Sequence, residues 1–154
     1  MRGRFLKIIS LVVLLILLVV GSYQIRQRAV LSHEVSPELG ALQQSRSGCP
    51  DSPNCRSSFA DDERHSIASI QGNLTDFDTL AAHIASTSNA EVRVLSNNYL
   101  WAIYTSKIFG FADDLELYYD GSEIHVRSAS RVGHSDLGAN KTRVETLRMV
   151  LETP

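Results

Sequence analysis

The longest apolar pattern in the chain lies at its start. Between residues 8 and 20 every position except Ser10 is apolar, and no polar positions recur there at a helical spacing. Extended to residues 5–23, the run makes a helix of roughly 28 Å, close to the bilayer hydrocarbon thickness of about 30 Å. The pattern predicts a single N-terminal transmembrane helix within a membrane anchor of residues 1–25, and a lipid bilayer as the partner of residues 5–23.

Basic residues on either side of this run indicate its orientation. Arg2, Arg4 and Lys7 precede the run, whereas only Arg26 and Arg28 follow it. Cytoplasmic flanks of membrane helices carry more Lys and Arg, so this bias favours a cytoplasmic N-terminus and an exported body. The run then acts as an uncleaved signal anchor. A cleaved signal peptide is the alternative, because small residues stand near the end of the run.

The pattern changes twice beyond the anchor. Residues 26–47 show no sustained apolar period and carry Gln, Ser, Glu and Arg, which is typical of a linker. A helical period then appears within the predicted domain of residues 48–154. Thr75 is expected to cap this helix, with Asp78 three residues later as the acidic partner in a capping box. The apolar stripe of the helix consists of Phe77, Leu80, Ala81, Ile84 and Ala85.

Strand patterns dominate the centre of the domain. The predicted strands cover residues 92–95, 99–104, 115–119 and 124–128, and residues 57–70 offer a further short strand. Asp120 and Gly121 are expected to form a primed hairpin turn, and Asn140 to cap a final helix over 141–152. This order predicts an α+β fold, an antiparallel four- to five-stranded meander with two helices on one face.

Two cysteines bear on the cellular compartment. Cys49 and Cys55 enclose five residues, two of them proline, and this stiff turn brings the thiols within reach of each other. A disulfide closing so short a loop stabilises a fold by roughly 2.4 kcal/mol in the chain-entropy model. The spacing suits neither a zinc knuckle nor a redox dithiol. We therefore expect a structural disulfide and an oxidising compartment.

Charge is distributed unevenly along the chain. The formal net charge of -2 hides a body in which residues 29–154 hold all 17 acids and only 10 of the 15 bases. An acidic body cannot neutralise phosphates over a wide surface, so nucleic acid is not expected as a partner. The length suits one ordinary domain beside the anchor.

The loop between the last strand and the last helix is the candidate binding surface, because bases and small residues concentrate there. The predicted contact residues are Arg127, Arg131, Ser135, Asp136 and Arg143, bordered by Asp113 and Asp114. Free amides at a helix start, with arginines nearby, suit a carboxylate or phosphate, so an anionic small molecule or an envelope protein is the expected partner. In the alternative interpretation the arginines pair with Asp113, Asp114 or Asp136 and lock the fold.

No residue can be assigned a catalytic role from the pattern. The neighbours His134, Ser135 and Asp136 cannot converge as a hydrolytic triad, and consecutive Asp113 and Asp114 point to opposite faces of a strand. The enzyme alternative is a hydrolase or transferase in which Asp113 or Asp114 works with His65 or His134. The five histidines show no metal-ligand spacing, so neither a metal nor a cofactor is expected. His125 alternates with Glu123 and Arg127, which suggests the wetter face of its strand.

Three motifs carry a resemblance to a known family. They are CPDSPNCRSS at 49–58, FGFADD at 109–114, and VRSASRVG at 126–133 with SDLG at 135–138. Over residues 48–151 the chain resembles the domain-of-unknown-function 1499 family, although Arg56 stands where an apolar residue is usual and His134 where Tyr is usual. The resemblance implies a small exported or membrane-tethered bacterial domain and supplies no activity, cofactor or catalytic residue.

Together these observations lead to one functional prediction with two alternatives. We expect a single-pass protein of the bacterial inner membrane with a cytoplasmic N-terminus and a periplasmic C-terminal domain. This domain is predicted to be a non-enzymatic binding or interaction module. The alternatives are the hydrolase or transferase described above and a purely structural envelope protein.

Overall fold

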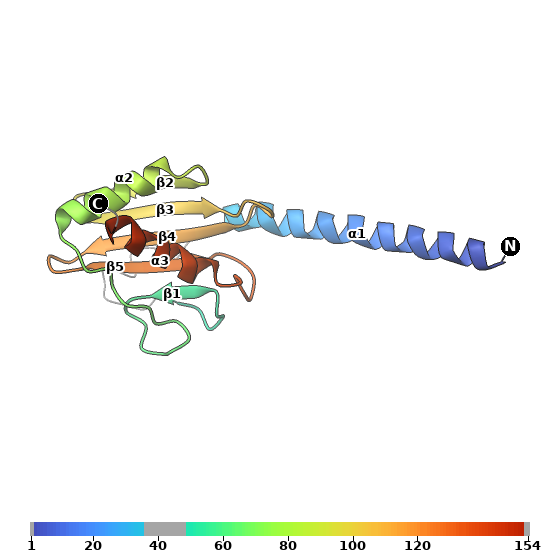
Figure 1. Cartoon of the computed structure of the whole chain (residues 1–154), viewed down its shortest axis with the longest axis horizontal. Coiled ribbons are helices and arrows are strands. Elements are labelled where there is room, and N and C mark those ends of the chain that lie inside the picture. The colour runs from blue at the N-terminus through green and yellow to red at the C-terminus, as the bar shows by residue number, and fades with distance from the viewer. Residues whose placement is uncertain (1, 36–48, 153–154) are drawn as a thin grey trace.

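A long helix and a separate body of sheet and helices make up the chain. The computed structural model describes residues 2–35 and 49–152. In chain order its elements are α1 (Arg2–Glu34), β1 (Cys55–Ser57), α2 (Leu74–Ser86), β2 (Ala90–Leu95), β3 (Tyr99–Thr105), β4 (Ala112–Tyr119), β5 (Ile124–Ser130) and α3 (Ala139–Glu152). α1 extends away from the body as a rod, and its C-terminal end meets one end of the sheet (Figure 1).

α1 is the apolar helix that the sequence predicts, and it is longer than predicted. The apolar side chains from Leu6 to Tyr23 are exposed along it. Within the described ranges it is the one helix long and apolar enough to cross a membrane, judged by length and composition. The helix continues to Glu34, so residues 26–34 of the predicted linker are helical, whereas residues 36–48 lie outside the described ranges.

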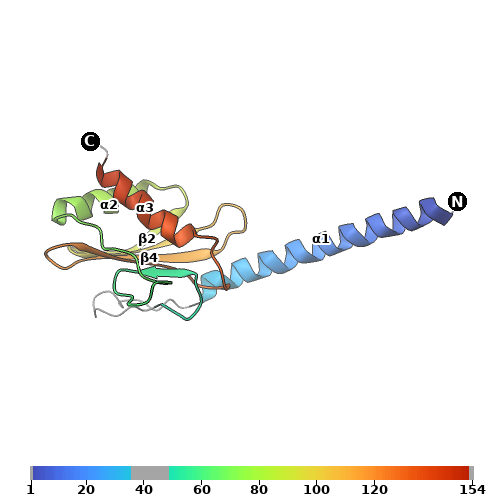
Figure 2. The same cartoon turned by 60° about the horizontal axis from the view of Figure 1, so that its bottom comes forward.

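The sheet has five antiparallel strands in the order β1-β5-β4-β3-β2. β2 to β5 form the predicted meander, and the fifth strand, β1, is added beside β5 slightly earlier in the chain than residues 57–70. α2 and α3 lie together on one face of the sheet (Figure 2). The α+β architecture with both helices on one face is therefore confirmed.

The core lies between these two helices and the sheet. α2 contributes the predicted stripe, in which Phe77, Leu80 and Ile84 are fully buried, whereas Ala85 is exposed. Leu115 and Leu117 of β4 meet this stripe from the sheet. Burial of each large apolar side chain is worth about 1.5–3 kcal/mol, so this helical face fixes α2 on the sheet.

Both helix caps differ from the sequence prediction. α2 begins one residue earlier than Thr75, and the capping box joins Asn73 to Asp76. Asn is a stronger N-cap than Thr, so the helix starts at the better acceptor. Asn140 lies inside α3, fully buried, and its backbone N–H donates to Asp136 Oδ2 at 2.8 Å.

The turn between β4 and β5 is also different from the predicted two-residue hairpin. Tyr119 pairs with Ile124, so four residues make the connection. Asp120 Oδ1 accepts the backbone N–H groups of Ser122 at 2.8 Å and Glu123 at 3.0 Å. The Asp120 side chain thus satisfies the turn locally, which allows a longer loop than the Asp-Gly pair suggests.

The sheet face away from the helices is buried, and this corrects the prediction of a wetter face. His125 is 7% exposed and Arg127 is 4% exposed, although both lie on that face. Phe59, from the segment after β1, stacks on the His125 ring with the ring centroids 4.1 Å apart. Charged residues on this face therefore need partners inside the protein.

The predicted disulfide is present. Cys49 and Cys55 are bonded, with their Cα atoms 5.7 Å apart and a sequence separation of 6. Cys55 is fully buried and opens β1, where it pairs with Ala129 of β5. The crosslink therefore fixes the start of the edge strand.

Candidate functional site

The consecutive acids of β4 point to opposite faces of the sheet, as the sequence predicts. Asp113 faces the helices, and Arg143 of α3 donates to its Oδ2 at 2.7 Å. Asp114 faces the other way and accepts Arg131 through both oxygens, with Nε and Nη2 each at 2.8 Å. This paired geometry is the strong form of an arginine–carboxylate contact.

Arg131 also reaches the end of α1. Its Nη1 donates to the backbone carbonyls of Ser32, His33 and Val35 at 3.5, 3.3 and 3.2 Å. Carbonyls at a helix C-terminus lack partners within the helix and carry partial negative charge, so a cation stabilises them. Trp101 Nε1 donates to Asp114 Oδ1 at 2.8 Å. One ion pair therefore connects α1, β3, β4 and the end of β5.

A second ion pair lies on the same face. Arg127 Nη1 is 3.4 Å from Glu116 Oε1, and the Glu116 side chain has no exposed area. Tyr99 donates its hydroxyl to Glu116 Oε2 at 2.7 Å. Because Glu116 and Arg127 are directly opposite each other in the β4–β5 ladder, the charges neutralise each other across the sheet.

The third predicted arginine, Arg143, belongs to a polar cluster between α3 and the sheet. Its Nη1 donates to Ser128 Oγ at 2.7 Å and to Asn140 Oδ1 at 2.6 Å. Its guanidinium carbon lies 4.4 Å from the ring centre of Tyr104. Burial raises the pKa of the Tyr104 hydroxyl.

The three arginines therefore have partners inside the domain. Two of the three aspartates that the pairing interpretation names do pair with arginines: Asp113 with Arg143 and Asp114 with Arg131. Arg127 instead pairs with Glu116, which that interpretation does not name. The role of these arginines in binding a ligand stays a prediction.

A cavity of about 430 Å³ lies where α1 meets the loops at the end of the sheet. Its lining is largely apolar and comes from α1, from the β3–β4 loop and from the β5–α3 loop: Arg28, Leu31, Ser106, Phe109, Phe111, Asp113, Ser130, Val132, Gly133, Ser135, Asp136, Leu137 and Ala139. Three predicted site residues, Asp113, Ser135 and Asp136, meet here. Arg28, Leu31 and Phe109 were not predicted, because no local pattern brings the anchor beside these loops.

Asp136 shapes the loop that forms one wall of this cavity. Its Oδ1 accepts the backbone N–H of Gly138 at 3.1 Å, while its Oδ2 caps the first turn of α3. The next residue, Leu137, is 96% exposed and has a φ of 53°, a left-handed conformation that is unfavourable for a leucine. The loop therefore presents an apolar side chain to its surroundings.

The β3–β4 loop runs along α1 on the other side. A second cavity, of about 890 Å³, separates Lys107, Ile108 and Phe109 of this loop from Ser22, Ile25 and Arg26 of α1. At the base of the loop, His33 Nε2 lies 2.9 Å from the Gly110 carbonyl oxygen, and Ser32 Oγ accepts the Ala112 N–H at 2.9 Å. The loop is thus attached to α1 at its base and open at its tip.

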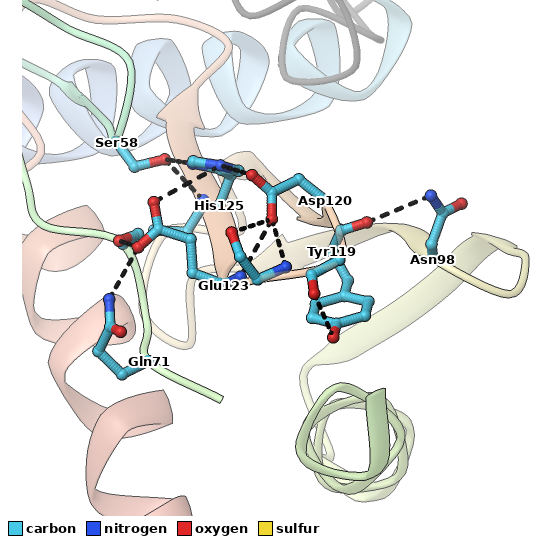
Figure 3. Close-up of polar contacts among 11 residues, drawn as sticks. Ser58, Gln71, Asn98, Tyr119, Asp120, Glu123 and His125 are labelled. Atoms are coloured by element: carbon cyan, nitrogen blue, oxygen red, sulfur yellow. Dashed lines mark hydrogen bonds and ion pairs between the residues drawn. The ribbon is translucent and has the colours of Figure 1, made fainter. Parts of the chain in front are cut away.

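A separate polar cluster surrounds His125 at the other end of β5 (Figure 3). His125 Nδ1 lies 3.3 Å from Ser58 Oγ, and Nε2 lies 3.0 Å from Asp120 Oδ2 and 3.7 Å from Glu123 Oε1. Ser58 Oγ accepts the Val126 N–H at 3.0 Å. With a proton on Nε2, His125 can accept the Ser58 hydroxyl proton at Nδ1, a serine–histidine–aspartate relay with the ring nitrogens exchanged relative to serine proteases.

Two carboxylates in this cluster are held in their charged form. The N–H groups of Glu123 and Ser122 and the His125 ring lower the pKa of Asp120 well below its usual range. Hydrogen bonds from Ser69 and then Gln71 lower the pKa of Glu123. His125 therefore faces two stable negative charges.

The residues of the predicted enzyme alternative are not brought together. His65 lies 2.9 Å from Asp62 Oδ2 through Nδ1 and 3.1 Å from the Ser52 carbonyl oxygen through Nε2. This contact lowers the pKa of Asp62. Across residues 2–35 and 49–152, no hydrogen bond or ion pair joins His65 or His134 to the consecutive aspartates of β4, and no cluster of His, Cys, Asp and Glu suits a metal ion.

Comparison with known proteins identifies the body. Residues 47–151 match the family model described as protein of unknown function (DUF1499). The chain belongs to the DUF1499 family. No curated protein and no solved structure matches it.

The residues that match the DUF1499 model include most of the 430 Å³ cavity and the cluster around His125. Both loops beside the 430 Å³ cavity and the whole His125 cluster lie within residues 47–151. Arg28 and Leu31, which form the α1 wall of the cavity, precede the match. The cavity is therefore formed jointly by the DUF1499 domain and the helix that comes before it.

Proposed function

We propose that this DUF1499 protein is a binding module anchored in the bacterial inner membrane, with its domain in the periplasm. Residues 5–23 cross the bilayer and the N-terminus lies in the cytoplasm. Three supports come from independent features: the exposed apolar surface of α1, the larger number of bases before residues 5–23 than after them, and the Cys49–Cys55 disulfide.

The binding site of this proposal is the cavity beside α1. Its volume of about 430 Å³ lies within the range of small-molecule pockets, and most of its lining is apolar. Arg28 is exposed at its α1 wall and forms no hydrogen bond or ion pair with any described residue. This unpaired cation beside an apolar cavity is the observation that carries the proposal. It suits an amphiphile whose apolar part fills the cavity and whose anionic group meets Arg28.

In this arrangement two of the three predicted arginines support the site from within the domain. Arg143 holds Asp113, which lines the cavity, and Arg131 fixes the end of α1 against the sheet. Ser135 and Asp136 form the wall opposite α1. The anionic ligand of the sequence prediction is kept, and its cationic contact becomes Arg28.

Native mass spectrometry tests the binding site. The full chain is released from nanodiscs that contain phosphatidylglycerol, and we expect a retained lipid mass on the protein. Arg28→Gln should lose this adduct, whereas the matched control Arg93→Gln, which replaces an exposed arginine of β2 outside the cavity, should keep it. An adduct of equal abundance on both variants, or no adduct on the wild type, contradicts the proposed site.

A reporter fusion tests the orientation separately. Alkaline phosphatase, which is active only after export, is fused after residue 154. Activity of this fusion, with loss of activity when Arg2, Arg4 and Lys7 are all replaced by Gln, supports a cytoplasmic N-terminus. An inactive fusion on a membrane-inserted protein contradicts the periplasmic location.

A second candidate function, esterase-type acyl transfer, is favoured by the Ser58–His125–Asp120 relay. Ser58 Oγ would attack the carbonyl carbon of an ester while its proton passes to His125 Nδ1. His125 would then return this proton to the departing alkoxide, and water would hydrolyse the acyl-Ser58. Asp120, kept charged by its hydrogen bonds, would stabilise the protonated ring.

Labelling with a fluorophosphonate probe tests this candidate. Covalent labelling of the wild type that disappears in Ser58→Ala and slows in His125→Gln supports the relay. The matched control is Ser86→Ala, at the exposed end of α2, and it should label normally. A wild type that does not react, or a Ser58→Ala variant that reacts equally, contradicts it.

A further inference from the structure

The end of the body that carries α1 exposes several large apolar side chains. Ile108 is 84% exposed and Phe109 is 51% exposed, both in the β3–β4 loop, and Leu137 of the β5–α3 loop is 96% exposed. Side chains of this size gathered at one end of a soluble surface mark a contact with a partner or a membrane.

The position of the β3–β4 loop relative to α1 indicates which partner. Ile108 lines the same cavity as Ser22 and Arg26, so the loop tip lies at that level of the helix. The apolar run of α1 ends at Tyr23, immediately beside Ser22. The loop therefore reaches the point where the helix leaves its apolar stretch.

The charges near this point are of one sign. Arg26 and Arg28 follow the apolar run on α1, and Lys107 precedes Ile108 in the loop. From Tyr23 to Arg28 the helix rises about 7.5 Å, comparable to the polar headgroup layer, which is roughly 5–7 Å deep on each side. The three cations would thus lie at the depth of lipid phosphates.

We propose that the β3–β4 loop inserts Ile108 into the same bilayer that α1 crosses, in the leaflet on the side of the domain. Phe109 extends this apolar contact, and Lys107 and Arg26 meet anionic lipid phosphates. The inference rests on the proposed membrane anchoring and adds a second contact with the lipid surface. Its main residues, Ile108 and Lys107, do not line the 430 Å³ cavity.

Quenching by brominated lipids measures this contact. The full-length Ile108→Trp variant is reconstituted in liposomes that contain anionic phosphatidylglycerol, with bromine on the acyl chains. The matched control is Leu95→Trp. Leu95 is 58% exposed, and it lies at the end of β2 beside the start of β3, away from the β3–β4 loop. Emission of the native Trp101 is subtracted with the wild type.

The tryptophan at position 108 should lose most of its emission in brominated vesicles and shift to shorter wavelength, whereas the one at position 95 should do neither. Emission at position 108 that is no more quenched than at position 95 overturns the inference, provided that α1 resists extraction by alkaline carbonate. Extraction of the protein by carbonate instead contradicts the anchoring itself. If the emission is not quenched and the protein instead forms oligomers as its concentration rises, the apolar loop contacts a second copy of the chain. This outcome also overturns the inference.

Discussion

The guanidinium of Arg131 connects the sheet to the end of α1, a contact that the local sequence around Arg131 does not reveal. It pairs with both oxygens of Asp114 and donates to three carbonyls at the end of α1. Both side chains of the pair are only 4% exposed. A buried carboxylate that loses its cation remains in a poorly solvated environment, which costs far more than the loss of an exposed ion pair.

Arg131→Gln should therefore destabilise the domain by about 3–5 kcal/mol. The measurement is urea unfolding of the full chain in detergent, followed by Trp101 fluorescence. Arg131→Gln combined with Asp114→Asn should lose less stability than the two single substitutions added together, because no buried charge is left alone. If the losses are simply additive, the two side chains are not coupled as described.

Asp120 should make the stability of the domain depend on pH in a defined direction. Its pKa is lower in the folded protein than the ordinary unfolded value, so its charge stabilises the fold above that value. The contribution is lost as the pH falls below about 4 and approaches the folded pKa.

Asp120→Asn should accordingly be less stable than the wild type near neutral pH, and the difference should shrink as the medium becomes acidic. Thermal unfolding at a series of pH values measures it. Asp61→Asn provides the control, because Asp61 is exposed and forms no ion pair within the described chain. A gap between Asp120→Asn and the wild type that widens toward low pH contradicts the assignment.

At the scale of elements, the edge strand β1 depends on its crosslink. β1 has three residues and is attached to the sheet through β5 alone. Replacement of Cys49 and Cys55 by Ser should cost roughly 2.4 kcal/mol, because the unfolded chain is no longer restricted. Chemical unfolding of the oxidised protein and the double variant measures the loss. Equal stability of the two would show that β1 holds its place without the crosslink.

The elements around the core could be predicted because their periods are local. The stripe of α2 and the alternation in the strands each need only neighbouring residues to be recognised. The burial of the sheet face away from the helices could not be predicted in this way. Glu116 and Arg127 alternate with apolar residues as exposed charges do, and only the register of β4 and β5 shows that they neutralise each other.

The candidate binding site was predictable in part for the same reason. The charge and small residues of the β5–α3 loop indicate a special segment, and Ser135 and Asp136 do line the cavity. The wall formed by Arg28 could not be predicted, because α1 meets this loop only through tertiary packing. The helical continuation beyond residue 25 was missed since its mixed composition resembles a linker.

At the scale of the whole molecule, the proposed membrane contact can be tested by changing the length of α1 between its apolar run and the domain. Seven alanines inserted after Tyr23 should add about 10.5 Å of helix and nearly restore the rotational phase. The domain then moves away from the bilayer, and the tryptophan of an added Ile108→Trp substitution should lose its quenching by brominated lipids. Undiminished quenching in a protein that stays inserted would show that the loop follows the membrane independently of α1.

The attachment of α1 to the sheet has a mechanical consequence. A domain joined to its anchor by a flexible linker changes orientation independently of the anchor. Here the contacts of Arg131, Ser32 and His33 fix the C-terminal end of α1 to the sheet. Helices in thinner bilayers tilt further from the normal. We expect the domain to tilt by the same angle as α1, so that the orientation of the domain reports the local thickness of the membrane. Solid-state NMR in oriented bilayers of two thicknesses would show both parts turning together.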